Sequence, residues 1–166
     1  MYSIFKKELN SFFGNPTGYI VIGIYLLLTG LLLWIFPGEY NVLDAGYANV
    51  DGLFYVSPWL FLFLCPAITM RLFAEEKQTG TWELLITKPL SKWSIVMGKF
   101  LAGWLLVVFS IIPTIIYFFT TLYLAEPVGN VDFGSFFGSF DGLFLLAAVY
   151  VSFGVFSSSL TNNQIV

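Results

Sequence analysis

The residues able to do polar chemistry are few, and many of them lie in one segment. Between Arg71 and Lys99 the sequence RLFAEEKQTGTWELLITKPLSKWSIVMGK holds eight charged residues in twenty-nine positions. The chain has no histidine and one cysteine, Cys65, and it lacks both the zinc-protease pattern H-E-x-x-H and the nucleotide-binding pattern G-x-x-x-x-G-K-[ST]. We therefore expect no catalytic residues, no metal site and no cofactor in this chain, and a segment that makes contacts.

The middle of this segment has the pattern of a short amphipathic helix over residues 81–88. Trp82, Leu85 and Ile86 share one helical face, and Glu83 lies on another. Such a helix can lie among the lipid headgroups, or it can be a docking surface for a cytoplasmic partner. The sequence leaves both possibilities open.

Turn-forming residues predict the two ends of this short helix. Gly80 lets the chain bend just before it, and Thr81 is a candidate N-cap. Pro89 stops the helix, and Ser91 can cap the helix that follows. We expect a helix with a hinge at each end.

The composition is that of an integral membrane protein that must position this segment. Hydrophobic residues make up 58% of the 166 residues and charged residues only 10%, with a mean hydropathy of +0.84. Four apolar runs are long enough to cross a bilayer as helices, and none alternates with the period of a barrel strand. We predict an all-α, polytopic bundle with spans at 17–36, 53–70, 100–124 and 142–160.

The basic residues predict the orientation of these spans. Segments 37–52 and 125–141 contain no lysine or arginine. All seven basic residues fall in segments 1–16 and 71–99, namely Lys6, Lys7, Arg71, Lys77, Lys88, Lys92 and Lys99. Because basic residues favour the cytoplasmic side, we expect a cytoplasmic N-terminus and a cytoplasmic loop at 71–99. A net charge of −3 gives no indication of nucleic-acid binding.

Two further patterns concern the helices. The N-terminal residues have an apolar and a basic helical face up to the break at Asn15–Pro16, which predicts a helix lying on the membrane surface. Gly134, Gly138 and Gly142 recur every fourth residue before the fourth span, a spacing that lets helices approach closely. These glycines can pack against another helix or can simply be turn residues.

The charged segment resembles a known family. Its residues FAEEKQTGTWELLITKPLSKW are similar to the E-E-K-x-x-G-T-x-E-x-L-x-x-x-P pattern between the second and third spans of ABC-2 type transporter permeases. The residues that match this pattern are Glu75, Glu76, Lys77, Gly80, Thr81, Glu83, Leu85 and Pro89. The flanking spans look like those of the gliding motility-associated permease branch, GldF.

The resemblance implies a function and partners. Such permeases have six spans, pair with a second permease subunit as a homo- or heterodimer, and lie in the bacterial inner membrane. A separate ABC ATPase subunit docks on a coupling helix after the second span. The expected ATPase-coupling residues are Glu75, Glu76, Gly80, Thr81, Glu83, Leu85 and Pro89, whereas Trp82 and Ile86 are expected to anchor the helix.

Two expectations follow from comparing this chain with that family. Four spans are present and the sequence ends at TNNQIV, so we expect the chain to be the N-terminal part of a six-span permease. Its function is then export or gliding motility driven by the ATPase. The alternative is a membrane anchor or assembly subunit of a motility or secretion machine that transports nothing.

Overall fold

The protein is a bundle of long helices. The structure, a computed structural model, describes residues 1–87 and 91–160, and in these residues all regular structure is helical. The elements are α1 (Tyr2–Gly14), α2 (Pro16–Trp34), α3 (Asp51–Gln78), α4 (Thr81–Ile86), α5 (Lys92–Ile111), the 3-10 turn η1 (Ile112–Thr114), α6 (Ile115–Leu124) and α7 (Phe133–Leu160). The predicted all-α fold is confirmed.

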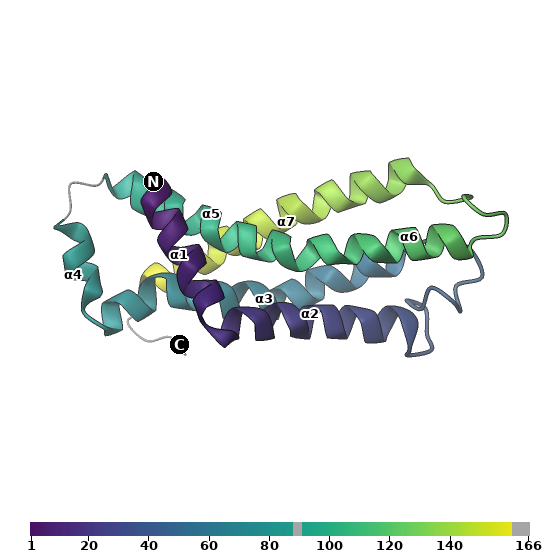
Figure 1. Ribbon diagram of the computed structural model, residues 1–166, viewed down its shortest axis with the longest axis horizontal. Helices are drawn as coiled ribbons and strands as arrows, with labels where there is room; N and C mark the ends of the chain where they lie inside the picture. The colour runs from purple at the N-terminus through teal and green to yellow at the C-terminus, as the bar shows by residue number, and fades with distance from the viewer. Residues whose placement is uncertain (88–90, 161–166) are drawn as a thin grey trace.

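Four of these helical units are long and apolar enough to cross a membrane. They are α2, α3, the continuous unit α5–η1–α6, and α7. Figure 1 shows them side by side in an elongated bundle, with α1 lying across one end. We call this the α4 end: it contains α1, α4, the last turns of α3 and α7, and the first turns of α5. Segments 35–50 and 125–132 form the opposite end.

The N-terminal helix ends where the sequence predicts. Asn15 has extended backbone angles, and Pro16 opens α2, where its missing N–H costs no hydrogen bond. The apolar face of α1 packs on α5, with Ile4 buried against Gly98. A β-carbon on Gly98 would lie 3.1 Å from the Ile4 side chain, so the glycine allows this close approach.

The charged segment is more helical than expected. α3 continues to Gln78, eight residues past the predicted end at residue 70, and α5 already begins at Lys92, so the connection at 71–99 shortens to residues 79–91. A span predicted from hydropathy ends at the first charged residue. The helix itself continues until its backbone hydrogen bonding is interrupted. Residues 71–78 contain no glycine or proline, and α3 ends just before Gly80, whose φ is +72°.

The short helix α4 is present with different ends. It spans Thr81–Ile86, so Thr81 is its first residue and the cap position belongs to Gly80; the prediction of Thr81 as N-cap is wrong by one residue. Lys88 and Pro89 lie outside the described residues. Ser91 caps α5 as predicted, since its hydroxyl accepts a hydrogen bond from the Ser94 N–H at 3.2 Å.

The fourth long helix also starts earlier than predicted. α7 begins at Phe133, nine residues before the expected boundary, so Gly134, Gly138 and Gly142 are helical and are not turn residues. In the middle of the third unit, Pro113 lies in η1, which separates α5 from α6. A proline lacks the N–H that would continue the hydrogen bonding of α5, which accounts for the local change of helix type.

The tightest helix crossing joins α3 to α7. A β-carbon placed on Gly154 of α7 would lie 2.1 Å from the Thr69 hydroxyl of α3, far inside a van der Waals contact. That hydroxyl also donates to the Cys65 carbonyl at 2.9 Å, which holds the Thr69 side chain in place. Gly154 therefore allows the backbones of α3 and α7 to come together.

Candidate functional site

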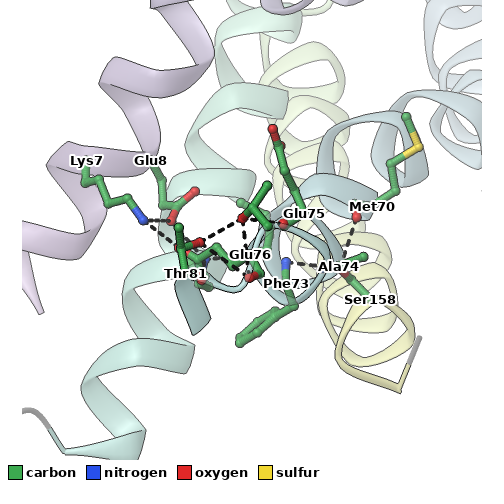
Figure 2. Close-up of polar contacts among 12 residues, drawn as sticks. Lys7, Glu8, Met70, Phe73, Ala74, Glu75, Glu76, Thr81 and Ser158 are labelled. Atoms are coloured by element: carbon green, nitrogen blue, oxygen red, sulfur yellow. Dashed lines mark hydrogen bonds and ion pairs between the residues drawn. The ribbon is translucent and has the colours of Figure 1, made fainter. Parts of the chain in front are cut away.

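A cluster of four charged side chains joins three helices at the α4 end. Lys7 and Glu8 come from α1, Glu76 from α3 and Lys99 from α5. The Lys7 ammonium lies 2.5 Å from one Glu76 oxygen, and the Lys99 ammonium lies 2.9 Å from the other. Lys99 is also 2.9 Å from a Glu8 oxygen, so each lysine contacts both carboxylates (Figure 2 shows the Lys7 side). We call these four residues the ion cluster.

Lys99 is the most deeply buried member of the ion cluster. Its side chain is 0% exposed, and its ammonium donates a further hydrogen bond to the Leu72 carbonyl. The ammonium also lies 5.0 Å from the centre of the Phe73 ring, where the π-face attracts a cation. A buried charge needs partners of opposite sign to offset its lost hydration. Glu8 and Glu76 supply them, and two lysines with two carboxylates make the cluster neutral.

The electrostatics of Lys7 follow from the same arrangement. Partial burial disfavours its charged form, but the hydrogen bond from Lys7 to Glu76 and the charges of Glu76, Glu8 and Glu75 outweigh this, so the pKa of Lys7 is raised above its ordinary value of 10.5. The pair is therefore ionised at neutral pH and fastens α1 to the last turn of α3.

Hydroxyl contacts continue from Glu76 to α4. The Thr79 hydroxyl donates to the Glu75 carbonyl at 2.8 Å and lies 2.9 Å from the Thr81 hydroxyl. The Thr81 hydroxyl lies 3.4 Å from the Glu76 carbonyl, to which it donates (Figure 2). The first residue of α4 is thus joined to the same helical turn that carries the ion cluster, across the bend at Gly80.

The faces of α4 differ in exposure. Trp82 packs its ring edge-to-face on Phe73, with the centroids 5.5 Å apart, and Leu85 is only 8% exposed. Thr81 and Glu83 are exposed. Phe73 therefore lies between Trp82 of α4 and Lys99 of the ion cluster. Phe73 thus contacts both α4 and the buried ammonium of the ion cluster.

The end of α7 is tied to the same turns of α3. The Ser158 hydroxyl lies within hydrogen-bond distance of the N–H groups of Phe73 (3.2 Å) and Ala74 (3.3 Å), and it is 3.3 Å from the Met70 carbonyl (Figure 2). The Lys77 ammonium donates to the Ser159 carbonyl. α7, like α1 and α5, is thus joined to the end of α3 that leads into α4.

The structure sorts the expected coupling residues into two groups. Exposed on the surface are Glu75, Gly80, Thr81 and Glu83. Glu76 and Leu85 face inward, Glu76 toward the ion cluster and Leu85 in the apolar core, so they support α4 and do not form its outer surface. Pro89 lies outside the described residues, as does the side chain of Ile86.

The glycines expected to pack against a helix have no such neighbour within the described part of this chain. A β-carbon at Gly138 or Gly142 would have nothing within 4 Å, and at Gly134 it would meet only the nearby Asp132 carboxylate at 3.4 Å. Close approaches between helices occur instead at Gly18, Gly30, Gly98, Gly103 and Gly154.

Sequence reasoning missed the ion cluster. It assigned Lys99 to a cytoplasmic loop and passed over Glu8, whereas the structure places both in helices that contact each other. One signal was present: Lys99 stands immediately before a run of twenty-six residues without charge, a position where a lysine either extends to the headgroups or pairs with a carboxylate.

One comparison with known proteins gives a family match for this chain. The sequence model of the family described as "ABC-2 family transporter protein" matches residues 59–165, which include most of α3 and all of α4, α5, η1, α6 and α7. No curated protein and no solved structure matches the chain.

Proposed function

This chain belongs to the ABC-2 transporter family, and from that premise we propose that α4 is the surface on which an ABC ATPase subunit docks. The family consists of membrane components of ABC transporters, which work with an ATPase subunit and are not themselves catalytic. The chain is thus a permease component with four helices able to cross the membrane. We infer that it couples ATP hydrolysis by the ATPase to export or to gliding motility.

The ion cluster is the observation that carries the proposal. α4 presents Thr81 and Glu83 outward, while Phe73 and the Thr81–Glu76 hydrogen bond connect it to the buried charges. A partner that presses on α4 therefore acts on α1, α3 and α5 together. A helix that only lay among the headgroups would need no such connection to a buried, neutralised set of charges.

The coupling proposal is tested by reversing the charge on the exposed face of α4. Glu83→Lys opposes both the dipole at the start of the helix and a basic partner surface. We expect co-purification of the ATPase with the permease to fall at least fivefold, with unchanged membrane insertion. The matched control is Asp44→Lys, an exposed carboxylate at the opposite end. Equal ATPase recovery with both variants would refute docking on α4.

We propose that the α4 end faces the cytoplasm of a bacterium and that the protein lies in the inner membrane. In support, the described basic residues gather at the α4 end, whereas segments 37–52 and 125–141 contain none. Single cysteines in a Cys65→Ser background test the orientation. A membrane-impermeant maleimide should label Asn49→Cys and Gly129→Cys in intact cells, and Gln78→Cys only after permeabilisation. Labelling of Gln78→Cys in intact cells would reverse the orientation.

We further propose that Gly134, Gly138 and Gly142 pack against a second permease subunit. Gly138 and Gly142 leave open space on α7 within this chain, and a small-residue face admits a close helix neighbour. Gly138→Leu should lower the recovered dimer without changing the thermal unfolding of the monomer. Unchanged dimer recovery in both detergent and lipid would show that these glycines are not part of a subunit contact.

The second candidate is a membrane anchor or assembly subunit that uses the ATPase for mechanical work and transports nothing. The same α4 surface would then serve attachment. The anchor function is favoured by the composition of the predicted spans. Residues 17–36, 53–70, 100–124 and 142–160 contain no acidic or basic residue, so no charged group there can select a substrate. ATP-dependent uptake or release of solute by reconstituted vesicles would separate the two functions.

A further inference from the structure

An apolar groove lies beside the site, between α3, α5 and α7. Its volume is about 470 Å³, which is within the range of roughly 300–1,000 Å³ for small-molecule sites. Phe73 closes it from α3, Val96 and Phe100 line it from α5, and Val155 and Phe156 line it from α7. The lining is almost entirely hydrocarbon, so the groove suits an acyl chain better than a polar solute.

Two lysines lie one helical turn beyond the lining residues, toward α4. Lys77 is one helical turn beyond Phe73 on α3, and its ammonium reaches the carbonyl of Ser159, which itself lines the groove. Lys92 is one turn before Val96 on α5 and is exposed. The groove therefore has an apolar body and a basic rim at one end.

Among the described residues, no carboxylate lines the groove. Glu76 is held in the ion cluster by Lys7 and Lys99, and Glu75 and Glu83 are exposed outside the lining. Trp93, next to Lys92, is 75% exposed. An exposed tryptophan is typical of the headgroup level of a bilayer. The rim is thus positively charged and lies where a lipid headgroup would be.

We propose that this groove binds a phospholipid with an anionic headgroup, with one acyl chain along Phe100, Val155 and Phe156 and the phosphate beside Lys77 and Lys92. Basic pockets between membrane helices bind such headgroups by charge. The bound chain would touch Phe73, the ring that also contacts Trp82 and Lys99. The lipid would then lie directly against the support of α4. The binding itself does not depend on ATPase docking.

The test measures lipid retention by the purified protein in detergent, using native mass spectrometry with dioleoyl-phosphatidylglycerol and, as the neutral probe, dioleoyl-phosphatidylcholine. Wild type should bind phosphatidylglycerol more tightly. Lys92→Gln should weaken that binding about fivefold and leave phosphatidylcholine unchanged, because one surface lysine is lost. The matched control is Lys6→Gln, an exposed lysine on α1 away from the groove, which should change neither.

A second pair of variants tests the apolar body. Ser152 is exposed and lines the groove, so Ser152→Trp should fill it and reduce retention of both lipids. Val149→Trp, one turn away on α7 and outside the lining, should not. Equal binding of the two lipids by wild type, or equal effects of Lys92→Gln and Lys6→Gln, would overturn the proposal. So would a change of oligomeric state with Ser152→Trp and no loss of lipid, which would assign the groove to another protein segment.

Discussion

The two ends of the bundle are held together by different forces. At the α4 end a buried lysine, Lys99, is neutralised by Glu8 and Glu76 from two other helices. Toward the opposite end, α6 and α7 meet through aromatic rings: Phe118 of α6 stacks on Phe136 of α7 with the ring centroids 4.1 Å apart, and Phe133 of α7 packs edge-to-face with Phe118 with the centroids 5.1 Å apart.

The two kinds of contact respond differently when one helix is displaced relative to its neighbour. Stacked rings slide past one another at low cost, since aromatic contacts are individually weak and tolerate several geometries. A buried ion pair does not, because separating its members leaves an unpaired charge inside the protein. We therefore expect the α4 end, which carries the proposed docking helix, to move as a unit.

The largest effect is expected when the ion cluster loses one partner. Glu76→Gln leaves Lys99 buried with Glu8 as its single carboxylate, and we expect the free energy of unfolding to fall by about 3 kcal/mol. The control is Glu75→Gln, the exposed neighbouring carboxylate, which should change stability by less than about 0.5 kcal/mol. Thermal unfolding followed by tryptophan fluorescence in detergent measures both.

The double variant Glu76→Gln/Lys99→Met sharpens this prediction. Removing the buried ammonium together with Glu76 should recover part of the lost stability, because a buried lysine with only one carboxylate partner is then no longer present. If Glu76→Gln and Glu75→Gln unfold at the same temperature, the ion cluster does not stabilise the α4 end.

A smaller effect is expected from adding one methyl group to α7 at two positions. Gly154→Ala places a carbon 2.1 Å from the Thr69 hydroxyl, so α3 and α7 must separate at a cost of about 1–3 kcal/mol. In the monomer, Gly138→Ala meets nothing within 4 Å and should be neutral or stabilising by up to about 1 kcal/mol, because alanine favours a helix. Similar losses at both positions, again measured by thermal unfolding, would contradict the crossing at Gly154.

The smallest effect concerns Lys7 and alkaline pH. Its pKa is raised in the folded protein, so its stabilising contribution is fully present below the unfolded value of 10.5 and is lost as pH rises through the higher folded value. Because Lys7 is 54% exposed, we expect less than about 1 kcal/mol. Wild type and Lys7→Gln should differ by a constant amount from pH 6 to pH 9 and converge only at more alkaline pH. A difference that vanishes below pH 9 would contradict the raised pKa.

Much of the fold could be predicted from the sequence because hydropathy and helix breakers act locally. The runs without charge predicted the four membrane-crossing helices. Asn15–Pro16 predicted the end of α1, and Ser91 predicted the start of α5. The charged ends of the helices were missed. Because each predicted span was bounded by the nearest charged residue, the prediction left out the last two turns of α3 and the first two turns of α5.

The ion cluster could not be predicted because its members are far apart in sequence. Lys7 and Glu76 are separated by 69 positions, and Glu8 and Lys99 by 91. No local pattern pairs them. The glycine prediction failed to find Gly154 for another reason: Gly154 and Ser158 have the same four-residue spacing as Gly134 and Gly138, and spacing alone does not say which face has a neighbour.

The measurement that tests the central claim most directly compares ATPase binding with ATPase stimulation in one reconstituted complex. Lys7→Gln leaves the outer surface of α4 unchanged but removes one link between α1 and Glu76. If the α4 end transmits force through the ion cluster, the variant retains normal ATPase co-purification, while the stimulation of ATP turnover by the permease falls at least twofold. If both stay at the wild-type level, or if binding and stimulation fall together, the ion cluster does not transmit the signal from α4.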